Sequence, residues 1–214
     1  SVAAPNIAGA ASLVSQYFTD KKYRSSVSVK PSSTLLRSLL INAADPLNKS
    51  KPSPDADVGF GTLNLGNYIL TSVSADGNDE NVLIGDQHLV AEVDIKDNSL
   101  DLRVTISYLD DALNDDSLVA LATDLDLVVV SPDQKVYRGN QRTDNTEEMY
   151  STNERIIIKK EDVKPGNYEI HVISRIPEIV PDRRNEFSIS VFGTLSDSAK
   201  EYIEFNKAKT CIPV

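Results

Sequence analysis

The chain has 214 residues, a formal net charge of −10, 40% hydrophobic residues and 25% charged residues. This is the composition of an ordinary folded protein, and the length allows one large or two small domains. The excess of acid argues against nucleic acid as a partner, because phosphate binding requires clustered lysine and arginine. No apolar run approaches the ~20 residues that cross a bilayer, so we expect no membrane-spanning segment. Cys211 is the only cysteine and has no disulfide partner within the chain.

Small residues dominate the start of the chain, which reads Ser1-Val2-Ala3-Ala4-Pro5-Asn6-Ile7-Ala8-Gly9-Ala10-Ala11. The apolar residues that follow Pro5 recur at helical spacing as far as Phe18, which predicts a helix over about residues 5–19. Pro5 is compatible with its first turn. A helix with so little side-chain bulk suits a fully buried position. Ser1 then lies at the positive end of the helix, where unpaired N–H groups can stabilise an oxyanion.

A second helix is predicted after a serine-rich stretch, with Ser32, Ser33 or Thr34 as its N-cap. Its apolar stripe consists of Leu35, Leu36, Leu39, Leu40 and Ala43. A proline-containing loop follows. The stretch Gly59-Phe60-Gly61-Thr62-Leu63-Asn64 then leads into a short third helix that we expect to end near Leu70.

Beyond about residue 82 the hydrophobic period changes from 3.6 to 2, which predicts strands. We expect strands at residues 89–95, 100–108, 125–130, 136–137, 156–158, 168–173 and 187–192. The run at 125–130 is continuously apolar, as in a strand that is central or covered on both faces. In the run at 100–108, the side chains of Leu102, Val104 and Ile106 should point inward. Those of Arg103, Thr105 and Ser107 should point outward.

These patterns predict an α+β chain of helices followed by an antiparallel sandwich. The helical part covers residues 1–72, a polar linker covers 73–81, the sandwich covers 82–195 and a tail covers 196–214. The tail pattern fits either a helix over 199–207 or a final edge strand. Because the sandwich has two inner faces of its own, we expect it to fold without the helices.

The first eleven residues resemble the nucleophile segment of the subtilisin-like serine proteases, the subtilases. The family pattern is Gly-Thr-Ser-(Met or Val)-Ala-x-Pro-x-(Val or Ile)-Ala-Gly, and on this match Ser1 falls on the catalytic serine. The Gly-Thr that precedes this serine in the family is absent. The predicted second helix and the Gly59–Asn64 stretch follow in the family's order, so the resemblance extends to about residue 72. The alternative is an alanine-rich buried helix whose first residue has no role.

The second part resembles the jelly-roll sandwich that follows the catalytic domain in many subtilases. The resemblance lies in the Leu102–Tyr108 strand, the Asp124–Pro132 segment and the Pro165–Tyr168 turn. The loop at residues 109–121 is longer and more acidic than expected for such a module. The resemblance therefore implies the end of an α/β catalytic domain followed by a jelly-roll-like β-sandwich.

The implied reaction is peptide-bond hydrolysis by acyl transfer to Ser1. In the family order the triad Asp and His precede the serine, so a peptide or protein substrate and an upstream catalytic segment are the expected partners. The chain alone should be inactive. The two histidines, His88 and His171, both fall in the sandwich and match neither triad position. His171 alternates with Tyr168 and Ile170, and we expect it to face solvent.

No cofactor is required by this resemblance. Asp110-Asp111, Asp115-Asp116 and Asp124/Asp126 offer oxygen ligands of the kind that calcium prefers, and related sandwiches sometimes bind calcium. The other interpretation is solvated loop surface. The resemblance also implies a secreted or secretory-pathway protein. A second hypothesis for function is a non-catalytic module in which the sandwich binds or stabilises a partner.

Overall fold

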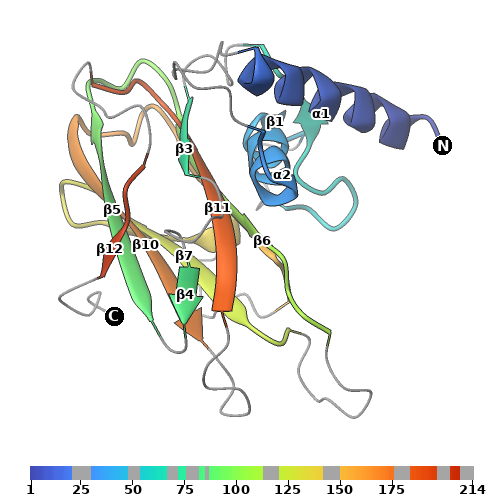
Figure 1. Cartoon of the computed structure of the whole chain (residues 1–214). Helices are drawn as coiled ribbons and strands as arrows, with labels where there is room; N and C mark the ends of the chain where they lie inside the picture. Colours follow the sequence, from blue (N-terminus) through green and yellow to red (C-terminus); the bar gives the residue numbers. More distant parts are fainter. Residues whose placement is uncertain are drawn as a thin grey trace.

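A computed structural model describes residues 1–20, 30–47, 54–66, 72–75, 82–84, 87–112, 121–141, 150–175, 184–196 and 203–207. Two helices lie on one side of a sandwich made of two antiparallel sheets, as Figure 1 shows. The architecture is α+β, as the sequence predicts. Within the described residues, no helix has the length and apolar character needed to cross a membrane.

The two helices are α1, Ala3–Thr19, and α2, Ser33–Asn42. Helix α2 begins at one of the predicted caps, because the Ser32 side chain accepts a hydrogen bond from the Leu35 amide at 3.0 Å. Helix α1 ends at Asp20, whose amide donates to the Gln16 carbonyl.

A two-stranded ribbon follows α2, formed by β1, Ala44–Asp45, and β2, Thr62–Leu63. Gly61 precedes β2 with φ +113°, and a Cβ atom at this position would lie 2.0 Å from the Asp45 carbonyl oxygen. Only glycine therefore fits here. The predicted third helix, which ends near residue 70, falls mostly outside the described residues.

Each layer of the sandwich is a five-stranded antiparallel sheet. The first has the order β3-β11-β6-β9, with β4 also paired to β11. Its strands are β3 Ser72–Ala75, β4 Val82–Ile84, β6 Leu102–Tyr108, β9 Asn153–Ile158 and β11 Arg184–Phe192. The second sheet has the order β12-β5-β10-β7-β8. Its strands are β5 His88–Ile95, β7 Asp124–Val130, β8 Val136–Arg138, β10 Gly166–Arg175 and β12 Asn206–Lys207.

The strand pairs are nested along the chain. Strand β3 pairs with β11, β5 with β10, β6 with β9, and β7 with β8, so each hairpin encloses the next. Successive pairs alternate between the two sheets. This winding is that of a jelly roll. The turn expected at Pro165–Tyr168 is present, and Gly166 opens β10 with φ +128°. The turn after β7 is closed by the Gln134 amide, which donates to the Ser131 carbonyl.

The core lies between the sheets and is built from the inward positions of every long strand. Leu102, Val104 and Ile106 belong to it, as predicted, together with the buried aromatic residues Tyr108, Tyr168 and Phe187. Strand β7 lies between β10 and β8, and its outward-facing Val128 and Val130 are also buried. The prediction of a strand covered on both faces is therefore confirmed.

The tail contributes an edge strand, which was one of its two predicted forms. Strand β12 pairs with β5, and Ile203 belongs to the core. Phe205 packs edge-on against Phe187 with ring centroids 5.2 Å apart. Strand β3, Ser72–Ala75, overlaps the start of residues 73–81, which the composition marks as a linker. The first part of that segment is sheet rather than linker, because its backbone pairs with β11.

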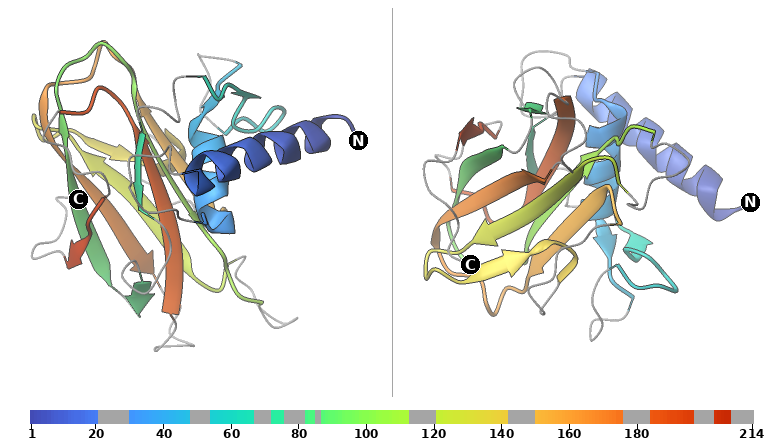
Figure 2. Two further views of the ribbon diagram at one scale, coloured as in Figure 1. Left: turned by 45° about the horizontal axis from the view of Figure 1, so that its top comes forward. Right: turned by 90° about the horizontal axis from the view of Figure 1, so that it is seen from below.

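Arg103, Thr105 and Ser107 point outward from the sandwich, as predicted, but this outer face of β6 does not meet water. Arg103, Thr105 and Ser107 are buried, with Thr105 and Ser107 0% exposed. Helix α2 lies across the outer face of the β11-β6-β9 sheet (Figure 2). Alternation along a strand identifies which side chains share a face, but a second layer decides whether that face meets water.

Val104→Asp and Thr105→Asp are both expected to destabilise the chain by about 3 kcal/mol or more, because each places a carboxylate at a fully buried position. Arg155 lies opposite Thr105, but its guanidinium is already bound to the Ile41, Ala44 and Phe60 carbonyls, so a carboxylate at position 105 would compete with those bonds. Urea unfolding followed by circular dichroism measures the effect.

Thr62→Asp is the matched control, since Thr62 is an exposed strand residue and should tolerate the same change. If Thr105→Asp proves as mild as Thr62→Asp, α2 does not cover this face in solution.

Candidate functional site

Ser1 lies just before the first turn of α1 and is exposed. The N-cap position is Val2, whose side chain makes no capping bond, and the Asn6 side-chain amide donates to the Val2 carbonyl at 3.1 Å. The first-turn N–H groups have no intrahelical acceptor, so this end carries the helix's partial positive charge. The placement matches the expected position of Ser1 at the positive end of a helix.

The first half of α1 is exposed, contrary to the prediction of a fully buried helix. Residues 1–9 are all exposed, and Val2, Ile7 and Leu13 expose 74%, 43% and 62% of their surface. Figure 1 shows this half projecting away from the rest of the molecule. The small residues thus form an apolar face that the described residues leave uncovered.

The second half of α1 holds the helix in place. Val14 and Phe18 of α1 form a small cluster with Leu35 and Leu39 of α2. The most apolar stripe of α2 therefore packs on α1. The sandwich contacts a different side of α2.

That second side of α2 is polar and buried. Thr34, Ser38 and Asn42 follow one another at i, i+4 and i+8 and are each at most 6% exposed. The hydroxyls of Thr34 and Ser188 of β11 lie 2.7 Å apart. Asn42 donates to the Ser190 carbonyl at 3.2 Å and accepts from Thr105 at 3.2 Å. Small polar side chains let the helix approach the sheet, and the hydrogen bonds of Thr34 and Asn42 offset the cost of their burial.

Arg155 of β9 holds the carboxyl end of α2. It is the largest fully buried side chain among the described residues. Its Nη1 donates to the Ile41 and Ala44 carbonyls at 2.7 Å each, and its Nη2 donates to the Phe60 carbonyl at 2.8 Å. Its guanidinium also lies 5.1 Å from the centre of the Phe60 ring. A cation here satisfies carbonyls that the helix cannot pair and interacts favourably with the negative end of its dipole.

Arg103 of β6 adds a second guanidinium to the same end. Its Nη1 donates to the Asn42 and Ala44 carbonyls at 3.2 Å, and its Nη2 contacts the Asp45 carboxylate at 2.7 Å. We refer to Arg103 and Arg155, with the carbonyls and carboxylate they bind, as the arginine clamp. The clamp joins the helical part to the sandwich through fully directional, charge-assisted bonds.

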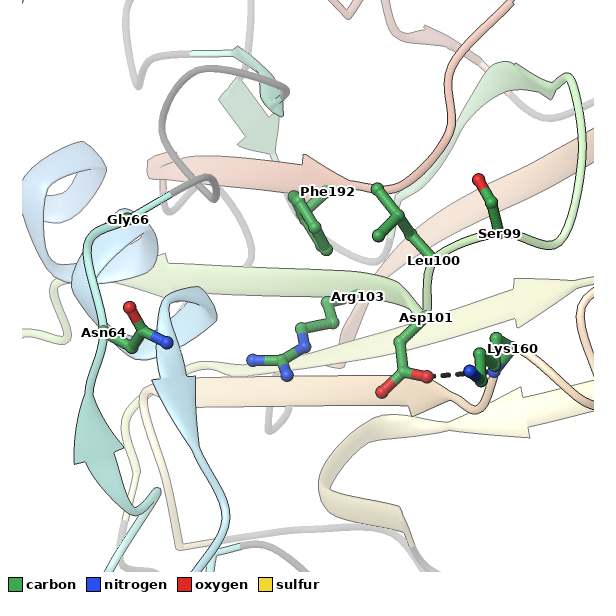
Figure 3. A pocket seen from close by; sticks show the side chains of 8 residues that line it. All are labelled: Asn64, Gly66, Ser99, Leu100, Asp101, Arg103, Lys160 and Phe192. Carbon is green, nitrogen blue, oxygen red and sulfur yellow. Dashed lines mark hydrogen bonds between the residues drawn. The ribbon is translucent and has the colours of Figure 1, made fainter.

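A cavity of about 480 Å³ lies beside the clamp, between the end of the β1–β2 ribbon and the sandwich. Figure 3 shows Asn64 and Gly66 on one side and the turn that carries Ser99, Leu100 and Asp101 on the other. Phe192, Arg103 and Lys160 complete the lining. Asp101 accepts from the Lys159 ammonium at 3.1 Å and from the Lys160 amide at 2.9 Å. The lining mixes charge of both signs with apolar surface.

The histidines lie far from Ser1. His88 begins β5 and His171 lies in β10, in the sheet that is remote from α1 in both Figure 1 and Figure 2. His171 is on the expected outer face but is only 5% exposed, so the prediction that it meets solvent is wrong. Its Nδ1 lies 2.8 Å from Nε2 of His88, and its Nε2 lies 3.2 Å from the Glu169 carboxylate.

Burial lowers the pKa of His88, and the nearby His171 lowers it further. Burial also lowers the pKa of His171, although the Glu169 carboxylate opposes this shift. Both rings are therefore biased toward the neutral form at neutral pH.

The acidic loops have local structural roles where they are described. The Asp110 carboxylate accepts from the Ala122 and Thr123 amides at 2.7 and 2.9 Å, so it closes its loop. Asp115 and Asp116 lie outside the described residues. Within the described part of the chain, no three His, Cys, Asp or Glu side chains converge as metal ligands would. Calcium binding stays a prediction.

Sequence reasoning missed the clamp and the histidine contact. Arg103 and Arg155 occupy outward strand positions, where a charged residue usually meets water. Ser188, Ser190 and Thr105 lie on the same sheet face as these arginines, and such small side chains indicate a face that a helix can cover. This grouping can be recognised only once the strand pairing is known.

Comparison with known proteins yields no match, either to a protein-family model or to a curated protein. The functional interpretation therefore rests on the residues themselves.

Arg155→Met should detach α2 from the sandwich, because the Ile41 and Phe60 carbonyls lose their buried donor. We expect a loss of about 3 kcal/mol in the free energy of unfolding. Arg155→Lys should recover little of this stability, since a single ammonium cannot bind all three carbonyls. Urea unfolding followed by the helical circular dichroism signal provides the measurement.

Arg138→Met is the matched control for this change, because Arg138 is a partly exposed arginine of β8. Equal effects of Arg155→Met and Arg138→Met would show that the clamp does not hold the helix.

Proposed function

We propose that this chain is the C-terminal part of a subtilisin-like serine endopeptidase. In this proposal Ser1 is the nucleophile that takes the acyl group of a peptide or protein substrate, and water then releases it. The His that activates Ser1 and the Asp that orients the His lie in a segment that precedes it.

The observation that carries the proposal is the segment Ser1-Val2-Ala3-Ala4-Pro5-Asn6-Ile7-Ala8-Gly9, with Ser1 at the positive end of a 17-residue helix. A serine in this position has backbone N–H groups beside it that favour an oxyanion. Subtilases use this arrangement, and the order of α2 and the Gly59–Asn64 stretch also agrees with theirs.

The uncovered face of α1 supports the same proposal. Alanine, glycine and isoleucine at helical spacing form a face that a β-sheet can approach closely, and the described residues do not cover it. The proposed upstream segment contains the parallel sheet of the catalytic domain, and this sheet would bury that face.

The second candidate function is a stabilising module without catalysis, and the arginine clamp favours it. Two buried guanidiniums of the sandwich bind the carboxyl end of α2, so the sandwich supports the helical part whether or not Ser1 reacts. In the first proposal the clamp has a related role: it fixes α2, and α2 fixes the second half of α1.

Labelling with a fluorophosphonate distinguishes the two candidates. The complete protein that contains this segment should be labelled at Ser1, and Ser1→Ala should abolish labelling. The 214-residue chain alone should not be labelled, because it lacks the base that activates the serine.

Ser12→Ala is the matched control, since Ser12 is an exposed serine of the same helix and hydrogen-bonds only along it, to the Ala8 carbonyl. An unlabelled complete protein, or equal labelling of Ser1→Ala and the unchanged protein, would leave the stabilising module as the function.

A further inference from the structure

His88, His171 and Glu169 form a continuous hydrogen-bonded chain on the outer face of the second sheet. His88 Nε2 lies 2.8 Å from His171 Nδ1, and His171 Nε2 lies 3.2 Å from a Glu169 carboxylate oxygen. The two rings belong to different strands, and their centroids are 5.0 Å apart. His171 is paired in register with Val90 and Val128, so its direct neighbours across the sheet offer no other acceptor.

One arrangement of protons satisfies both contacts of this hydrogen-bonded chain when the two rings are neutral. His171 donates from Nε2 to Glu169, which leaves its Nδ1 as an acceptor for the Nε2–H of His88. One added proton on Nδ1, the other nitrogen of His88, preserves both bonds and strengthens the one between the rings. A second proton must occupy Nδ1 of His171, where it opposes the N–H of His88 at hydrogen-bonding distance.

We propose that His88 and His171 form a proton-operated latch between β5 and β10. The latch is closed when the two rings are neutral or share one added proton, and it opens when a second proton is added. The proposal does not depend on the reaction assigned to Ser1. It concerns the sandwich alone.

Other charged groups on this face act on the first proton. Glu92 lies directly across from Glu169, and Asp94 follows it on β5. From β7, Asp124 and Asp126 lie on the same face, and Arg138 of β8 is paired with Val128, which is itself paired with His171, so its cation opposes protonation. The carboxylates attract a proton to the pair as a whole. They do not relieve the opposition of two N–H groups between the rings.

The direction of the pH effect follows from proton counting. In the unfolded chain, both histidines bind a proton near the ordinary pKa of 6.5. In the folded chain, burial and the contact between the rings disfavour binding of the second proton. Burial lowers the pKa of both rings, so the stability they contribute is complete above pH 6.5. It is lost as the pH falls below that value, because the unfolded state then binds more protons.

The latch lies where β5 begins. The Ser174 amide of β10 donates to the Gln87 carbonyl at 2.8 Å, directly beside His88. Opening the latch should therefore loosen this end of the β5–β10 pairing first, before the core strands respond.

The wild-type chain provides the primary test, by NMR titration of the two imidazoles together with amide hydrogen exchange between about pH 7.5 and about pH 5. We expect the two rings to titrate as a coupled pair, with one midpoint well below 6.5. Protection of the Ser174 amide, corrected for intrinsic exchange, should fall about tenfold or more, the factor that one pKa unit represents. Independent titration of both rings near 6.5, with unchanged protection of Ser174, would overturn the proposal.

Two variants separate the latch from general acid sensitivity. His88→Gln removes the inter-ring contact and should flatten the dependence of the urea midpoint on pH over the same range. Glu92→Gln removes a carboxylate of the same face that does not belong to the hydrogen-bonded His88–His171–Glu169 series. This variant should keep the dependence of the urea midpoint on pH. Parallel loss of stability in the unchanged chain and His88→Gln would contradict the latch.

Discussion

The burial of two guanidiniums at the end of one helix organises this structure. Arg103 and Arg155 cannot lose their charge, and they are removed from water, so each must bind acceptors that the rest of the chain brings to it. Those acceptors are the Ile41, Asn42, Ala44 and Phe60 carbonyls and the Asp45 carboxylate. The carboxyl end of α2, the β1–β2 ribbon and strands β6 and β9 are thereby fixed relative to one another. Gly61 completes the arrangement, because only glycine allows the backbone before β2 to lie so close to the Asp45 carbonyl of β1.

Much else follows from this constraint. Because α2 presents Thr34, Ser38 and Asn42 to the sheet, its leucines are left to hold α1. The position of α2 therefore depends on the sandwich, and the position of the second half of α1 depends on α2. Ser1 and the uncovered face of α1 lie beyond the last of these contacts, in the half of α1 that does not pack on α2. The sandwich therefore positions α1 through α2 without touching Ser1, which is consistent with both candidate functions.

The parts of the fold with local causes could be predicted from sequence. Ser32 caps α2, and the period-2 runs became the strands of the jelly roll. The burial of Arg103 and Thr105 could not be predicted, because an outward strand position carries the same pattern whether a helix or water covers it. The contact between His88 and His171 depends on the register of strands far apart in the chain. The proposed role of Ser1 rests on residue offsets and on its place before α1, because neither histidine of the chain lies near it.

Hydrogen exchange of the unchanged chain, resolved by amide, tests the central claim most directly. If the arginine clamp makes α2 part of the sandwich, the amides of Leu39 to Asn42 should be as protected as those of Val104 and Ile106. They should then exchange only through global unfolding. The amides of the first half of α1 should exchange much faster. Exchange of the α2 amides at the rate of an unfolded peptide, beside a protected β6, would show that the helix is not held by the clamp.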